Sequence, residues 1–327
     1  MKYRILGKTG FKISEVSLGT WQLGGRWGEK YSGENAQKIL QKAYEKGINF
    51  IDTADVYNDG KSEVSTGKFL KQVSSRIYVA TKCGRKLNPH TAAGYNKKNI
   101  TGFVEDSIKR LDVEALDLIQ LHCPPTEVYY QNEAFEALED LKMKGKVLNY
   151  GVSVEKIEEA LQAVKQPGVA AVQIIYNIFR QRPAREFFEI ADKNNVGIIV
   201  RVPLASGLLT GKLGPDSKFS KGDHRNFNRE GKFFDKGETF SGVPYDVGLE
   251  AAEQLKKVFK SQNIARFALK WVLENEFVSC VIPGASSPEQ VEENAEVSGM
   301  CGLSQEEMQR TREIYDTYIK EHVHKLW

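Results

Sequence analysis

Residues 47–70 read GINFIDTADVYNDGKSEVSTGKFL, and the rest of the chain can be interpreted outward from them. The apolar run at the start has the length of a buried strand and leads without a turn into the carboxylate of Asp52. Tyr57 comes five residues later, before the turn sequence at 58–60. Ser62 is then expected to cap a helix. An acid at the end of a strand and a phenol in the loop beyond it lie where parallel α/β proteins carry their chemistry.

Apolar runs of strand length alternate with amphipathic stretches along the whole chain. Strands are predicted at 16–18, 48–51, 77–80, 116–121, 147–152, 171–175, 196–200 and 278–282. Helices are predicted at 32–46, 62–72, 98–110, 132–144, 155–165, 184–194, 246–259, 262–275, 288–297 and 304–320. Eight strands, most followed by a helix and with no long linker, predict a single domain over 1–327 in the α/β class. The expected architecture is a (β/α)8 TIM barrel with an N-terminal β-hairpin around 7–10 and extra helices at the C-terminal end.

Composition excludes several classes of protein. The chain of 327 residues has a net charge of +3 and no long basic run, so no nucleic-acid partner is expected. No apolar run approaches the roughly 18 residues of a membrane span, and the N-terminus lacks the apolar core of a signal peptide. Four scattered cysteines predict reduced thiols in a cytoplasmic protein rather than disulfides or a metal site: Cys83, Cys123, Cys280 and Cys301.

Polar side chains stand at the ends of three consecutive predicted strands: Asp52, Lys82 and His122. In a barrel these tips meet at one face, beneath Tyr57. Asp52 is expected to pair with Lys82 and keep it protonated. The charge of Lys82 is expected to bring the pKa of Tyr57 down toward neutrality, so that the phenol exchanges a proton with substrate while His122 orients the substrate oxygen. Proton transfer to a carbonyl usually has a hydride as its partner.

Each of the four residues also has an ordinary structural interpretation. Asp52 could cap a helix, Tyr57 could be a core aromatic, Lys82 could form an ion pair or a Schiff base, and His122 could be a satisfied structural histidine. Their common placement at one predicted barrel mouth favours a functional site.

The motifs IDTADVY (51–57), ATK (80–82) and LHCP (121–124), in this order and spacing, resemble the aldo-keto reductase superfamily. The resemblance extends from the segment at 18–21 to Ile-Pro-Gly at 282–284. It implies that Tyr57 donates the proton, assisted by Asp52, Lys82 and His122. It also implies NADPH, with NADH possible, bound without a separate dinucleotide-binding domain, and small aldehydes, ketones or alcohols as the substrates.

The resemblance further implies a set of cofactor-binding residues, which includes Asp52. Around the nicotinamide end these are Gly19, Thr20, Trp21, Ser153, Gln173 and Arg201. For the pyrophosphate they are Pro203, Leu204, Ser206, Gly207, Leu208 and Lys212. For the adenosine half they are Gly284, Ser286, Gln290, Glu293 and Asn294.

The sequence departs from the family's pattern at several of these places. Val154 stands where the family usually has an asparagine. Arg201 stands where a tyrosine commonly stacks on the nicotinamide, so its planar guanidinium either replaces that ring or forms an ordinary ion pair. Ala285, Ser286 and Gln290 are neutral where many relatives carry a cation for the 2′-phosphate, although NADPH remains the expected cofactor.

Substrate is expected to meet an aromatic mouth formed by Trp21, Trp27 and Tyr57, with His122 beside it. The long irregular segment at 202–245 is expected to be a functional loop that covers cofactor or substrate. Two other functions stay open: a nucleotide-sensing regulatory subunit with little turnover, and a Schiff-base lyase that uses Lys82.

Overall fold

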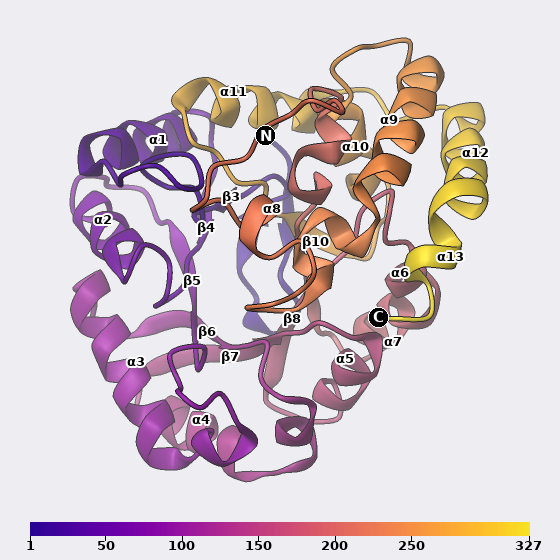
Figure 1. Cartoon of the computed structure of the whole chain (residues 1–327). Coiled ribbons are helices and arrows are strands. Elements are labelled where there is room, and N and C mark those ends of the chain that lie inside the picture. The colour runs from indigo at the N-terminus through magenta and orange to yellow at the C-terminus, as the bar shows by residue number, and fades with distance from the viewer.

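Eight parallel strands form one sheet whose order follows the chain, from β3 to β10 (Figure 1). The computed structural model describes all residues from 1 to 327. The strands are β3 (Leu18–Gly19), β4 (Phe50–Asp52), β5 (Tyr78–Cys83), β6 (Leu116–His122), β7 (Val147–Ser153), β8 (Val169–Ile175), β9 (Gly197–Arg201) and β10 (Val278–Val281). The sheet closes on itself because the Ser17 amide donates to the Val281 carbonyl at 2.9 Å and the Gly19 amide to the Pro283 carbonyl at 3.1 Å. The predicted (β/α)8 barrel is thereby confirmed.

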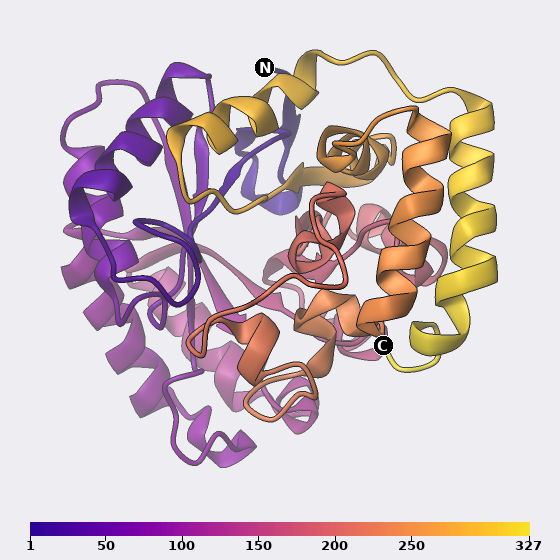
Figure 2. The ribbon, with the colours of Figure 1, turned by 45° about the horizontal axis from the view of Figure 1, so that its top comes forward.

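Helices cover the outside of the barrel. They are α1 (Gly33–Glu45), α2 (Lys61–Leu70), α3 (Lys97–Leu111), α4 (Glu133–Met143), α5 (Ile157–Ala163), α6 (Arg182–Glu186), α7 (Phe188–Lys193), α8 (His224–Phe227), α9 (Tyr245–Phe259), α10 (Ala265–Leu273), α11 (Pro288–Glu296), α12 (Gln305–Ile314) and α13 (Lys320–Val323). Figure 1 shows α1 to α5 following one another around the strands, and Figure 2 shows α12 lying along α9 on the outer surface. No helix combines the length and the apolar composition of a membrane span.

Two predicted helices are interrupted. The helix expected at 184–194 breaks at Phe187, whose φ of −125° is not helical. Phe187 is only 1% exposed, so burial of its ring fixes the break. The helix expected at 304–320 loses its regular winding after Ile314, where a π-helical turn covers Tyr315–Ile319. In that turn the Tyr315 hydroxyl lies 2.8 Å from Nδ1 of His324, a tertiary contact that helical periodicity does not reveal.

The predicted hairpin is present as β1 (Tyr3–Ile5) and β2 (Lys12–Ser14), and it closes one end of the barrel. Leu6 and Ile13 of this hairpin join an apolar cluster with inward-facing barrel residues. The turn packs so tightly that a Cβ on Gly7, whose φ is +46°, would lie 2.2 Å from the Gly197 amide at the start of β9. Only glycine tolerates both that approach and that backbone conformation.

A layer of polar side chains lies next to this apolar cluster, toward the carboxyl ends of the strands. Alternate residues of a strand face the same side. The inward residues of the apolar cluster include Phe50, Ala80, Leu118, Ala171 and Ile199. Two positions farther along the same strands stand Asp52, Lys82, Gln120, Gln173 and Arg201. The inner face of the barrel therefore changes from apolar to polar within two residues of each strand, at the carboxyl ends where barrel enzymes place their sites.

Candidate active site

Lys82 is the centre of the polar layer. Its side chain is fully buried and its ammonium makes three hydrogen bonds. Nζ donates to Oδ2 of Asp52 at 2.5 Å, to the Thr53 carbonyl at 2.9 Å and to Oη of Tyr57 at 3.2 Å. An ammonium has three donors, so every one is used. These distances confirm the predicted pairing of Asp52 with Lys82 and the predicted position of Lys82 beside Tyr57.

Asp52 is also held by two side-chain amides, a contact that the local motifs do not reveal. Its Oδ1 accepts from Nε2 of Gln120 at 3.2 Å and from Nε2 of Gln173 at 2.7 Å. The two amides also contact each other at 3.3 Å. A buried carboxylate needs hydrogen bonds to every side, and three barrel strands supply them here. Gln120 could have been found from the two-residue period, because it lies two positions before His122 in β6.

The ionisation of Lys82 and Tyr57 follows from these contacts. Burial by itself would lower the pKa of Lys82, but Asp52 and then Tyr57 outweigh it, so the pKa is raised and the ammonium stays charged. Burial raises the pKa of Tyr57, and although Lys82 acts in the opposite direction, burial prevails. The expected net lowering of the Tyr57 pKa was therefore wrong. The phenol remains protonated at neutral pH, which suits a proton donor.

His122, the last residue of β6, stands beside the phenol. Its ring lies 5.9 Å from that of Tyr57, nearly perpendicular to it, and its side chain lines the cavity described below. Burial, followed by the charges of Arg85 and Lys82, holds the pKa of His122 well below its usual range. The imidazole is therefore neutral, and its buried Nδ1 has no hydrogen-bond partner in the protein. A neutral ring can both accept and donate a hydrogen bond at a bound molecule.

Ser62 is not the helix cap that the sequence predicts. Gly60 occupies the capping position of α2, with φ of 80°. Asn58, Asp59 and Gly60 all have positive φ, as expected for the predicted turn. Ser62 instead points toward the barrel, where its hydroxyl donates to Thr20 Oγ1 at 2.8 Å and contacts Thr53 Oγ1 at 2.9 Å. This chain of hydroxyls ties the ends of β3 and β4 together beneath the loop that carries Tyr57.

A cavity of about 460 Å³ opens above the polar layer. Most of the residues expected to hold cofactor or substrate line it: Gly19, Thr20, Trp21, Trp27, Asp52, Tyr57, His122, Gln173, Arg201, Pro203, Leu204, Ser206, Gly207, Lys212, Gly284, Ser286, Gln290, Glu293 and Asn294. The volume falls in the range of small-molecule sites. The residues of its wall come from segments far apart in the sequence, from strand β3 to helix α11.

Ser153 and Leu208 are not brought to the cavity wall. Ser153 is 1% exposed, and its Oγ lies 3.5 Å from the thiol of Cys123. Leu208 belongs to the main core, and a Cβ on Gly248 of α9 would lie 2.6 Å from its Cδ1. Further lining residues were not singled out from the sequence as cavity residues: Gln22, Arg26, Val202, Thr210, Leu213, Glu238, Ala265, Ile282 and Pro283. Most of them are adjacent in sequence to expected site residues, and this adjacency is the feature from which they could have been predicted.

Arg201 forms the ion pair considered for it, whereas its stacking on a nicotinamide stays a prediction. It lines the cavity, and it also forms buried ion pairs with Glu155 at 2.8 Å and with Glu238 at 3.7 Å. Arg85 contacts the same two carboxylates. Although burial opposes it, the two carboxylates together raise the pKa of Arg201. Its buried Nε has no partner within the protein. The guanidinium is thus locked in orientation while one donor remains unused.

An aromatic wall stands over the phenol. The Trp21 ring lies 6.3 Å from that of Tyr57 and stacks at 19°, and Trp27 meets Trp21 edge-on at 5.3 Å. His224 from the segment at 202–245 packs against both tryptophans, at 4.7 Å and 4.2 Å. Arg225 lines the cavity and pairs with Asp223 at 2.6 Å. The long segment therefore reaches the cavity, and an ion pair fixes its Arg225 at the wall.

Comparison with known proteins agrees with these features. The model of the aldo/keto reductase family matches residues 15–316. Aldo-keto reductase YhdN of Bacillus subtilis (strain 168) is 30% identical over 333 residues, covering 99% of this chain and 96% of that protein. A putative voltage-gated potassium channel subunit beta of Schizosaccharomyces pombe is 32% identical over 308 residues, covering 89% and 86%. The glycerol dehydrogenase of Gluconobacter oxydans has a similar structure, with a TM-score of 0.78 at 28% identity over 98% and 96% of the two chains. With its barrel, its buried Lys82–Asp52 pair and a family match over nearly its whole length, this chain belongs to the aldo/keto reductase family of oxidoreductases.

Proposed function

We propose that this protein is an NADPH-dependent reductase of aldehydes or ketones, acting reversibly, in which Tyr57 supplies the proton. The observation that carries the proposal is the hydrogen bond from the buried ammonium of Lys82 to the phenol of Tyr57 at the edge of the cavity. The reduced nicotinamide, when bound, supplies the hydride. A carbonyl that accepts a hydride also needs a proton on its oxygen, and the protonated phenol of Tyr57 is the acid available there.

The surrounding groups support that role. Lys82 donates to Oη of Tyr57, so the phenol's own hydrogen is directed elsewhere and can reach a substrate oxygen in the cavity. As the phenol gives up its proton, the neighbouring ammonium stabilises the phenolate that forms. His122 has a neutral ring with an unpartnered nitrogen and can position the same oxygen. Trp21 and Trp27 would exclude water from the other side.

The cavity fits a nicotinamide dinucleotide in chemical terms. Gln173, whose amide contacts Asp52, and Arg201, whose Nε has no partner, both line the cavity. At the cavity wall, Arg26 and Lys212 form no salt bridge with any carboxylate, which suits a polyanionic ligand. These cations suit the phosphates of either cofactor, and NADPH is preferred in the proposal because of the family resemblance. Ser286 and Gln290 carry no charge, and the Ser286 amide donates to Oε1 of Gln290 at 2.8 Å. Because no cation stands at these two positions, NADH stays the alternative cofactor.

The geometry favours hydride transfer over Schiff-base chemistry. A Schiff-base lysine must be neutral and accessible when it attacks a carbonyl. Lys82 is charged, fully buried and engaged through all three donors. The regulatory alternative is kept because channel beta subunits are among the relatives. It predicts cofactor binding with negligible turnover. We also propose a cytoplasmic location, which the four free thiols support.

The test is a titration with NADPH and NADH, followed by a panel of aldehydes and ketones at saturating levels of the preferred cofactor. The account predicts tighter binding of NADPH and carbonyl-dependent loss of the reduced-nicotinamide absorbance. Tight cofactor binding with no turnover on any carbonyl would favour the regulatory alternative. Tighter binding of NADH would refute the cofactor preference while leaving the reaction class standing.

A further inference from the structure

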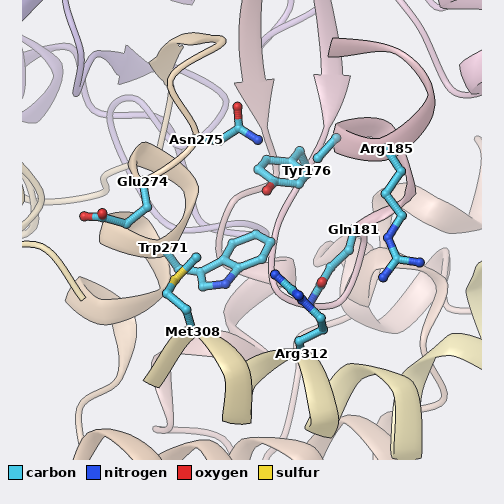
Figure 3. Close-up of a pocket in the computed structure, with 9 residues that line it drawn as sticks. Tyr176, Gln181, Arg185, Trp271, Glu274, Asn275, Met308 and Arg312 are labelled. Carbon is cyan, nitrogen blue, oxygen red and sulfur yellow. The ribbon is translucent and has the colours of Figure 1, made fainter. Parts of the chain in front are cut away.

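A second cavity lies on the outer side of the barrel, between α6, α10 and α12 (Figure 3). Its volume is about 360 Å³, and no residue that lines it also lines the active-site cavity. The two cavities are separate, but one helix contributes to both. Helix α10 carries Ala265 at the wall of the active-site cavity and Trp271 at the wall of this one.

The floor of the second cavity is aromatic. The rings of Tyr176 and Trp271 lie 5.0 Å apart at 34°, and both residues are at most 5% exposed. Met308 of α12 adds a thioether beside Trp271, as Figure 3 shows. Trp271 is a buried core residue that also lines this cavity. Such a floor accommodates a flat apolar group.

The rim of the same cavity carries two cations. Arg185 of α6 and Arg312 of α12 both line it, and neither forms a salt bridge with a carboxylate. Their neighbours on the same helices are paired: Arg182 with Glu158 and Glu186, both at 2.8 Å, and Arg310 with Glu306 at 3.9 Å. Glu274 is the carboxylate of the cavity wall. It pairs with Lys270 at 3.2 Å, and Figure 3 shows it turned away from Trp271.

Charge and shape together define what this cavity can take. Two guanidinium groups without carboxylate partners are the preferred ligands of a carboxylate or phosphate oxygen. Figure 3 shows the side chains of Arg312 and Gln181 reaching the space between Trp271 and Arg185. We propose that this cavity is a second ligand site, distinct from the active site, which binds a small anion that carries a flat aromatic ring.

The test uses 2-naphthoate as the probe and calorimetric titration of the full-length protein, with the active-site cavity saturated by NADP⁺. We expect one binding event in the wild type, weakened about tenfold or more in Arg312→Gln and in Arg185→Gln, because each removes one charged hydrogen bond to the carboxylate. The matched control is Arg310→Gln, on the same helix but outside the cavity, which should bind as the wild type does. The uncharged 2-naphthamide should bind the wild type about tenfold more weakly and be insensitive to Arg312→Gln.

Arg185 and Arg312 are exposed, so the variants are expected to fold, and equal thermal midpoints would verify this. Absence of 2-naphthoate binding to the wild type would overturn the proposal. Binding that is unaffected by both arginine substitutions, or that Trp21→Leu in the active-site cavity abolishes, would overturn it as well, because the probe would then sit elsewhere.

Discussion

The Nζ of Lys82 donates a hydrogen bond to the Oη of Tyr57 over 3.2 Å. This direction matters because a phenol that accepts from an ammonium keeps its own hydrogen free for another acceptor. The ammonium can accept nothing, and its remaining two donors are used by Asp52 and the Thr53 carbonyl. The phenol is therefore the one group of this cluster that can pass a proton to a molecule in the cavity.

Replacing Lys82 with methionine should lower stability as well as turnover. Asp52 would be left as a buried carboxylate with two amide donors but no counter-charge. Breaking a buried pair in this way typically costs about 3–5 kcal/mol. The measurement is urea unfolding followed by circular dichroism. The double variant Lys82→Met with Asp52→Leu, which removes both charges, should recover much of the loss. Equal stability of the single and double variants would contradict the pairing.

Carbonyl reduction should show little pH dependence around neutrality. Tyr57 must be protonated, and its raised pKa means that activity is lost only as the pH rises beyond the ordinary range of a phenol. His122 must be neutral, and its lowered pKa means that it charges only in acid. A profile of kcat for reduction should therefore be flat from about pH 6 to about pH 9. A bell-shaped pH profile of kcat with an apparent pKa inside that interval would show that another group controls proton transfer.

Asp55 should make the fold less stable as the pH rises. Its side chain is fully buried, and neither carboxylate oxygen has a hydrogen-bond partner. Burial and then the charge of Glu63 raise its pKa to about 7. The pKa of an aspartate in the unfolded chain is near 4. Between about pH 4 and pH 7 the folded state therefore holds a proton that the unfolded chain has released, so the free energy of unfolding falls as the pH rises through this interval.

The change Asp55→Asn should remove this pH dependence. At about pH 8 we expect the variant to be more stable than the wild type by on the order of 2–4 kcal/mol, and at about pH 4 nearly equal to it. Thermal midpoints at the two pH values are the measurement. A gain of the same size at both would mean that Asp55 does not titrate in this interval.

Gly67 and Gly102 offer a matched pair on two helices that pack together. A Cβ on Gly67 of α2 would lie 2.2 Å from the backbone carbonyl oxygen of Leu111 in α3. A Cβ on Gly102 of α3 would meet nothing within 4 Å. We expect Gly67→Ala to destabilise by about 1–3 kcal/mol and Gly102→Ala to stabilise by roughly 0.5–1 kcal/mol. Chemical unfolding of the two variants checks the opposite signs, and an unchanged Gly67→Ala protein would refute the close helix contact.

The order of strands and helices could be predicted because each strand is an apolar run of the right length, ending at a polar residue such as Asp52 or His122. The polar residues at the ends of consecutive strands carried the prediction of a polar barrel mouth. Helix interruptions could not be predicted in this way. The break at Phe187 and the π-helical turn at Tyr315 depend on partners far away in the sequence or on the burial of one ring.

The residues of the candidate site could be predicted from the sequence more fully than their pKa values. Local motifs identify Tyr57 and Lys82, but the pKa of Tyr57 depends on how deeply the folded chain buries it, and burial outweighs the nearby charge. Met143 illustrates the same limit, because this apolar residue at the end of α4 is 73% exposed. A pattern in one helix does not show which of its edges the neighbouring elements cover.

The most direct test of the account is the single-turnover rate of hydride transfer in Tyr57→Phe, measured at a saturating level of NADPH with the best carbonyl substrate. The substitution removes only the hydroxyl that contacts Lys82, so the affinity for NADPH should stay within about twofold of the wild type, while the rate should fall about a hundredfold or more. A wild-type rate in a variant that still binds the cofactor would contradict the assignment of Tyr57 as the proton donor.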